Sequence, residues 1–157
     1  MSVKIGDKAP DFTLIDATRK PRSLKEFQGK KAVLAFFPAA FTGVCTKEFC
    51  TFPDSLANLE KMDAQVVGIS VDPPFANKAY SDAYGFTFPL LSDYSRKAIR
   101  AYGVVHEDFA GLPGYSAAKR SIFVLDRSGV VKYGWVSDDP SKEPNYEEVT
   151  KALQSIP

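Results

Sequence analysis

Two cysteines, Cys45 and Cys50, are the side chains of this sequence best suited to covalent chemistry. They close the segment Phe37-Pro-Ala-Ala-Phe-Thr-Gly-Val-Cys-Thr-Lys-Glu-Phe-Cys50. A thiolate is a strong nucleophile, and its sulfur can be oxidised reversibly to a sulfenic acid or a disulfide. In a reducing compartment a purely structural disulfide is rare, so paired thiols are more often catalytic, metal-binding or simply buried. The residue types alone leave these three alternatives open.

Cys45 is expected near the start of a helix, because Thr42 is a suitable N-cap that would place it at the third helical position. There the unpaired N–H groups and the positive end of the helix dipole favour the thiolate. For a thiol of ordinary acidity this activation gains about 30-fold at neutral pH, far below the millions-fold accelerations typical of enzymes. Groups that orient a substrate and stabilise developing charge are therefore needed as well. The Thr42 hydroxyl and a nearby guanidinium are candidates, although Thr42 as a helix cap alone is the alternative.

Cys50 follows Cys45 by five residues. On an ideal helix these positions are about 7.5 Å apart along the axis and about 140° apart in rotation. Their Cα separation then exceeds the limit of about 7 Å for a disulfide, so a bond requires local unwinding. Pro53 has no N–H to donate to the Phe49 carbonyl, and we hypothesise that it lowers the cost of unwinding. The alternatives are that Pro53 only kinks the helix and that Cys50 is a small buried hydrophobe.

Apolar periodicity outlines the elements that must position these residues. Continuous apolar runs predict strands at 31–37, 64–71 and 120–126, a turn at 126–129 followed by a hairpin strand at 130–136, and a short strand at 88–91. Spacings of three and four, together with capping signals, predict helices at 45–62, 72–84, 95–102 and 145–155. Asp72 is the expected N-cap of the second helix, with prolines in its first turn, and Ser23 to Glu26 has capping-box spacing.

The order of these elements predicts an α/β fold. Early alternation of strands and helices implies parallel strands with right-handed crossovers, and the late hairpin adds antiparallel strands. We expect a mixed central sheet with helices on both faces, typical of a thioredoxin-like fold, in a single domain covering 1–157. The segment 37–50 leaves the end of the first predicted strand, at the sheet edge where α/β proteins bind ligands.

Composition excludes several other classes of function. The charged side chains nearly balance, with a formal net charge of +1, so neither nucleic acid nor an anionic membrane is an expected partner. No apolar run approaches the roughly 18 residues of a membrane span, and the first residues lack the apolar core of a secretory signal, so we expect a cytoplasmic location.

His106 is the sole histidine. One histidine with two cysteines is too few for structural zinc, so no metal is expected, and His106 is predicted to be a surface or loop residue.

The motif Pro38-x-x-x-Thr42-x-x-Cys45 resembles the active-site signature of the peroxiredoxins, the alkyl hydroperoxide reductase and thiol-specific antioxidant family. Residues 6–14 resemble the opening of the family sequence, and residues 67–72 and 88–93 resemble its later blocks. Residues 120–129 resemble the strand that carries the family's active-site arginine, so the similarity covers essentially the whole chain. The resemblance implies a thiol-dependent peroxidase, without a cofactor, that reduces hydrogen peroxide and organic hydroperoxides. It also implies a thioredoxin-like or other thiol as reductant.

The resemblance also implies roles for individual residues. Cys45 would be the peroxidatic cysteine that becomes a sulfenic acid. Thr42 would hydrogen-bond the thiolate and the peroxide, Arg120 would stabilise the developing charge, and Pro38 would shield the site from water. Glu48 matches an acidic position common after the cysteine and would orient the arginine, the alternative being a charge in the first helical turn.

The spacing of Cys45 and Cys50 is similar to that of the Q-type, or bacterioferritin-comigratory, branch. There the second cysteine resolves the sulfenic acid into an intramolecular disulfide. Two features depart from this branch: residues 37–45 resemble the one-cysteine E-type branch, and Pro53 stands where arginine is common. No cysteine follows Cys50, so resolution by a C-terminal cysteine is not expected. The family implies a monomer or a homodimer.

Two other functions remain as alternatives. One is a redox sensor or chaperone-like binding protein switched by oxidation of Cys45 and Cys50. The other is a thiol–disulfide oxidoreductase of the thioredoxin type, which usually carries Cys-x-x-Cys, a motif absent here. Trp135 and residues 109–115 are predicted either to border the substrate pocket or to pack in the core.

Overall fold

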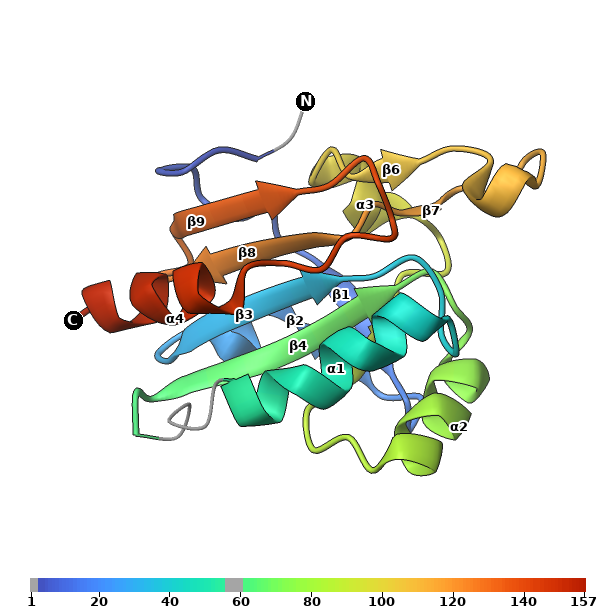
Figure 1. Cartoon of the computed structure of the whole chain (residues 1–157). Helices are drawn as coiled ribbons and strands as arrows, with labels where there is room; N and C mark the ends of the chain where they lie inside the picture. The colour runs from blue at the N-terminus through green and yellow to red at the C-terminus, as the bar shows by residue number, and fades with distance from the viewer. Residues whose placement is uncertain (1–2, 56–60) are drawn as a thin grey trace.

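The backbone fold is given by a computed structural model, which describes residues 3–55 and 61–157, with 51–55 described as backbone. Among these residues, seven strands form one mixed sheet in the order β2-β1-β5-β4-β3-β8-β9 (Figure 1). The strands are β1 (Thr13–Asp16), β2 (Pro21–Ser23), β3 (Lys31–Phe36), β4 (Ala64–Ser70), β5 (Leu90–Ser92), β8 (Ser121–Leu125) and β9 (Val131–Val136). The predicted strands are therefore present.

β3 is an interior strand of the sheet, which pairs in parallel with β4 and antiparallel with β8. All six residues of β3 are buried, as its continuous apolar run predicts. β4 and β5 are also parallel, whereas β8 and β9 form the predicted antiparallel hairpin. The β3 pairing brings Phe36 opposite Ser121, so the chain leaving β3 lies beside the residue that precedes β8. This register is what later joins Cys45 and Arg120.

Helices cover both faces of the sheet, as predicted. They are α1 (Gly43–Ser55), α2 (Pro74–Tyr84), α3 (Lys97–Ala101) and α4 (Tyr146–Ser155), with the short 3-10 helices η1 (Leu24–Phe27) and η2 (Phe109–Gly111). α1 and α4 lie on the same face, where they pack on one core cluster that includes Val33 and Phe49 (Figure 1). A second cluster on the other face contains Leu34 and Ile99. The alternating side chains of β3 thus supply both cores.

Several predicted helix ends shift for identifiable reasons. α1 begins at Gly43, directly after the predicted cap Thr42 and two residues before the apolar pattern that starts at Cys45, and positions 56–60 of the predicted helix lie outside the described residues. The prediction that Asp72 caps α2 is wrong, because Pro73 occupies the N-cap and the Asp72 carboxylate accepts the Ala40 N–H instead. α3 begins two residues late. For α4 the predicted range of 145–155 differs by one residue, because Asn145 is the N-cap and its side chain accepts two backbone N–H groups.

The structure also contains strands that the sequence reasoning missed. The β1–β2 hairpin extends the sheet beyond β5, and β6 (Val105–His106) pairs with β7 (Ala117–Ala118) in a separate ribbon. These strands are two to four residues long and carry little apolar periodicity. His106 therefore lies in a strand rather than a loop, half-buried, with its ring edge-on to Phe109.

Within the described residues, no helix is both long and apolar enough to span a membrane.

Candidate active site

The loop from Phe37 to Thr42 connects the end of β3 to α1 and forms one wall of the site. Pro38 is buried, whereas Phe41 is exposed with a positive φ of 65°. A bulky residue in this left-handed region is strained and needs support. The Phe41 ring packs on Tyr80 of α2, with the ring centroids 4.9 Å apart. The contact with α2 thus helps to hold the turn that leads the chain into α1.

Cys45 is the third residue of α1, as predicted, and its side chain is fully buried. The Arg120 guanidinium donates to it, with Nη2 3.1 Å from the Cys45 Sγ. Arg120 precedes β8 and is itself 1% exposed. The antiparallel β3–β8 pairing brings these residues together from positions far apart in the chain. A cation at this distance stabilises negative charge on sulfur and on an oxygen bound beside it.

Glu48 holds the other side of the same guanidinium. Arg120 Nη1 donates to the Glu48 Oε2 at 2.7 Å, and Arg120 Nε donates to the Pro140 carbonyl at 3.1 Å. The planar fork is therefore fixed on both sides, so that Nη2 points at Cys45. This is the orienting role that the sequence resemblance implied for Glu48.

Glu48 and Arg120 form a fully buried ion pair. Among the described residues, the second carboxylate oxygen of Glu48, Oε1, has no hydrogen-bond partner. Burial raises the pKa of Glu48 to about 7, although the charge of Arg120 opposes that rise. Burial alone would lower the pKa of Arg120, but the neighbouring Cys45 and Glu48 raise it above its usual value. Arg120 therefore stays charged while Glu48 is able to change charge near neutral pH.

Thr42 stands immediately before α1, and its carbonyl accepts the first helical hydrogen bond from the Thr46 N–H at 3.0 Å. Its hydroxyl donates to the Ala39 carbonyl at 2.9 Å. In the part of the chain that the structure describes, this hydroxyl is not bonded to Cys45. The expected thiolate contact is thus replaced by a bond within the loop, which leaves the Thr42 oxygen lone pairs for an incoming group.

Cys50 lies on the same helix but on a different side. Both cysteines are free thiols, and Cys50 is exposed whereas Cys45 is buried. The backbone of α1 remains helical across Pro53 to Ser55. The predicted separation of the two cysteines in an unbroken helix therefore holds for this state, and a disulfide between them requires α1 to unwind.

Three supporting residues escaped the sequence reasoning. Tyr80 shares a hydrogen bond of 2.9 Å with the Thr46 hydroxyl and so ties the first turn of α1 to α2. Asp72 binds the loop through the Ala40 N–H. Glu143 accepts from the Tyr146 hydroxyl and forms an ion pair with Lys47 of α1. Each of these contacts joins segments that are distant in the sequence. Only Asp72, which follows the predicted strand at 64–71, has a position in the sequence that could have indicated a role in the site.

Two apolar regions were predicted either to border the substrate pocket or to pack in the core, and both contribute to the core clusters. Trp135 packs against the core cluster on the α1 and α4 face. Phe109 belongs to the core of the opposite face. Tyr115 is half-buried near the site: burial raises its pKa, and the negative charges of Asp72 and Cys45 add to that rise.

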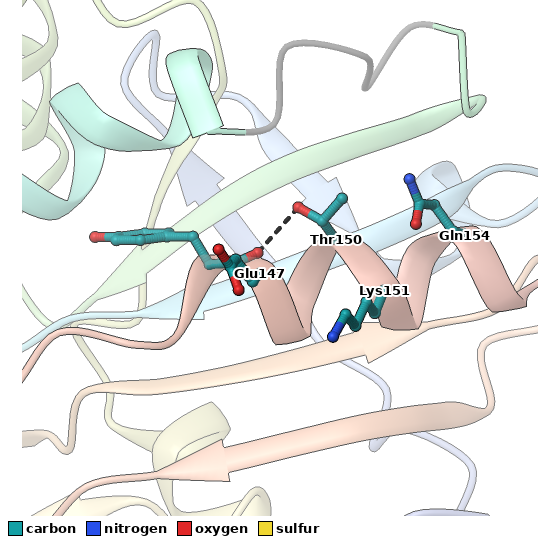
Figure 2. Close-up of a pocket in the computed structure, with 5 residues that line it drawn as sticks. Glu147, Thr150, Lys151 and Gln154 are labelled. Atoms are coloured by element: carbon teal, nitrogen blue, oxygen red, sulfur yellow. Dashed lines mark hydrogen bonds between the residues drawn. The ribbon is translucent and has the colours of Figure 1, made fainter.

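The surface hollow shown in Figure 2 lies along α4, and none of the predicted site residues lines it. It has a volume of about 410 Å³ and is lined by Tyr146, Glu147, Thr150, Lys151 and Gln154, all from α4. Thr150 uses its hydroxyl on the Tyr146 carbonyl within the same helix. In the described part of the chain no group of three or more histidine, cysteine or acidic side chains is arranged to hold a metal ion.

A thioredoxin-like sheet that places a buried thiol at a helix start, beneath a fixed guanidinium, defines the thiol-peroxidase class. The model of the AhpC/TSA family matches residues 5–134. Peroxiredoxin Q, chloroplastic, from Populus jackii is 40% identical over 154 residues, covering 98% of this chain and 70% of that protein. Alkyl hydroperoxide reductase E from Mycobacterium bovis is 42% identical over 134 residues, covering 83% of this chain and 84% of that protein.

Structural comparison agrees. The crystal structure of peroxidoxin BcpB from Mycobacterium tuberculosis superposes with a TM-score of 0.81 at 35% identity, covering 96% of this chain and 94% of that one. The chain therefore belongs to the AhpC/TSA family of peroxiredoxins. It is a thiol-dependent peroxidase, which acts on peroxides with a thiol reductant.

Proposed function

We propose that Cys45 is the residue that attacks the peroxide. The Cys45 thiolate bonds to one peroxide oxygen, the O–O bond breaks, and the departing oxygen leaves as an alkoxide or hydroxide that takes up a proton to become an alcohol or water. Cys45 is thereby oxidised to a sulfenic acid and the peroxide is reduced by two electrons. The 3.1 Å contact between Arg120 Nη2 and Sγ carries the proposal, because it puts a cation where both reacting charges lie.

Thr42 and Pro38 complete this site. Because the Thr42 hydroxyl gives its hydrogen to Ala39, its oxygen is available to accept the O–H of a hydroperoxide and so to orient the O–O bond toward sulfur. Pro38 is buried and has no N–H to attract water, which keeps the pocket dry. The substrates are hydrogen peroxide and organic hydroperoxides, since recognition uses only the peroxide group.

Cys50 then resolves the sulfenic acid. Its thiolate attacks the Cys45 sulfur, the S–O bond breaks as the S–S bond forms, and the sulfenic oxygen leaves as hydroxide that takes a proton from solvent to become water. A thioredoxin-like thiol returns both cysteines to thiols. Because Cys45 is buried and Cys50 exposed on one helix, this step requires the first turns of α1 to leave the core.

The setting of this cycle is also part of the proposal. A cycle that ends in reduction by a thiol depends on a reducing pool such as that of the cytoplasm, where we place the protein. The chemistry uses residues from one chain throughout, so it proceeds in a monomer or a homodimer alike.

Peroxide consumption with a thiol reductant tests the first step. The Cys45→Ser variant is expected to lose turnover, and normal turnover by that variant would refute the proposal. Stoichiometric oxidation of the wild type without turnover would instead indicate a redox sensor. Mass spectrometry without reductant, after one equivalent of peroxide, tests the second step. A Cys45–Cys50 bond is expected, whereas a lasting sulfenic acid with Cys50 free would mean a one-cysteine mechanism.

A further inference from the structure

The peptide group between Ala39 and Ala40 is bonded at both ends to side chains. Its carbonyl accepts the Thr42 hydroxyl at 2.9 Å, and its N–H donates to the Asp72 Oδ2, also at 2.9 Å. A continuous path of hydrogen bonds therefore runs from the Thr42 hydroxyl through one peptide group to the Asp72 carboxylate. The path joins the active-site loop to the end of β4.

Asp72 is firmly held where it meets the loop. The Ser70 hydroxyl donates to the same Oδ2 at 2.7 Å, and the Asp72 N–H donates back to the Ser70 oxygen at 3.2 Å. The Ser92 hydroxyl, from the end of β5, donates to the Asp72 carbonyl at 2.5 Å. Ser70 of β4 thus holds the carboxylate of Asp72 and Ser92 of β5 holds its backbone, so the position of Asp72 is set by the sheet rather than by the loop.

A negative charge at the N–H end of a peptide group polarises that group and strengthens its carbonyl as an acceptor, by roughly 10–30% per bond in a chain of hydrogen bonds. Here the strengthened acceptor is the Ala39 carbonyl, which receives the Thr42 hydrogen. A hydroxyl has a single hydrogen to donate. If that hydrogen stays on Ala39, the Thr42 oxygen can only accept, which is what binding the O–H of a hydroperoxide needs.

We propose that Asp72 is a positioning residue that keeps the Thr42 hydroxyl in the orientation that accepts a hydrogen bond from the peroxide. The proposal rests on the proposed role of Thr42 in binding the substrate. Without the carboxylate, the Thr42 hydroxyl is held less firmly on the Ala39 carbonyl and can turn its hydrogen toward the peroxide, so the acceptor that orients the substrate is lost while the thiolate itself is unchanged.

The test uses Asp72→Asn, because an amide oxygen can still accept from Ala40 and Ser70 while the charge is gone. Asp93→Asn is the matched control: Asp93 is a buried carboxylate at the end of β5 that also accepts two backbone N–H groups, from Ala98 and Ile99 of α3. All variants carry Cys50→Ser, so that oxidation of Cys45 is measured by itself.

Two rate constants are measured at one pH: oxidation of Cys45 by hydrogen peroxide, and its alkylation by iodoacetamide. Asp72→Asn is expected to lower the peroxide rate constant about tenfold, which is the scale of one charge-assisted hydrogen bond. The alkylation rate constant is expected to stay unchanged. Asp93→Asn should leave both rate constants unchanged. In a Thr42→Val background, Asp72→Asn should lower the peroxide rate constant by less than about twofold, because the group through which it acts is gone.

An equal loss from Asp72→Asn with and without Thr42, a parallel fall in the alkylation rate, or an unchanged peroxide rate would each overturn the inference. These results are distinct from failure of the proposed function, which shows as peroxide turnover without Cys45 or as a Thr42→Val variant that reacts normally.

Discussion

Replacing Glu48 with glutamine should change how the stability of the reduced protein depends on pH. Glu48 is fully buried against Arg120, and burial raises its pKa from the usual 4.5 to about 7. The folded protein therefore binds a proton on Glu48 that the unfolded chain releases above pH 4.5. The stability from that proton is complete below about pH 4.5 and is lost as the pH rises through about 7.

The magnitude follows from the two pKa values. A difference of about 2.5 pH units, at about 1.4 kcal/mol per unit, makes the wild type up to about 3 kcal/mol less stable at pH 8 than at pH 4.5 on account of Glu48 alone. The glutamine amide oxygen can still accept from Arg120 Nη1 but does not titrate. The free energy of unfolding of Glu48→Gln relative to wild type should therefore increase from pH 5 to about pH 7 and level off by pH 8. The charged groups facing Glu48 are Arg120 and Glu143, and both are unchanged in the variant.

The assay is urea unfolding of the reduced proteins at several pH values in that range. Glu147→Gln is the control, because Glu147 is an exposed acid in the first turn of α4, and its difference from wild type should be flat with pH. A flat difference for Glu48→Gln as well would refute the reasoning. It would mean that Glu48 stays ionised across the range and that its pairing with Arg120 outweighs burial.

Three further predictions concern the cycle itself. Arg120→Met should lower the rate of Cys45 oxidation by about 10²–10³-fold, as for loss of one preorganised donor, measured by stopped-flow; a loss under tenfold would contradict its role. Cys50→Ser should leave that rate within twofold but abolish turnover with a thioredoxin-type reductant, and full turnover would show that Cys50 does not resolve. Tyr80→Phe removes the hydrogen bond to Thr46, so it should destabilise the protein by about 1 kcal/mol and speed disulfide formation in quenched mass spectrometry. Slower or unchanged disulfide formation would show that this bond does not restrain α1.

Much of the fold could be predicted from local sequence patterns. The apolar run at 31–37 became β3, and the placement of Cys45 three residues into α1 followed from a plausible cap alone. The same reasoning failed where contacts with distant segments decide where a helix begins. Asp72 looks like a helix cap in sequence, yet its carboxylate is taken by Ala40 of a distant loop. The β1–β2 hairpin was missed because strands so short carry little periodicity of their own.

The candidate site divides in the same way. Nothing near Cys45 in the sequence indicates that Arg120 will reach it, because that contact depends on the β3–β8 register. The family resemblance supplied it, along with the pairing of Glu48. The resemblance did not supply Asp72 or Tyr80 as partners of the loop and helix, since their contacts arise only once α2 and β4 are packed against α1.

The geometry around Cys45 also bears on how α1 can both hold the thiolate and release it. In the reduced state the Arg120 guanidinium, which Glu48 holds in place, attracts the Cys45 sulfur. Because Cys45 is buried, water does not screen this attraction. In the proposed cycle, oxidation converts the Cys45 thiolate to a neutral sulfenic acid, so the negative charge that Arg120 attracts disappears. The added oxygen must also fit a side chain that is already fully enclosed. In the proposed cycle both effects weaken the hold on the first turn of α1 only after the peroxide has reacted, so we expect the protein to stay closed for attack and to open for the proposed resolution by Cys50.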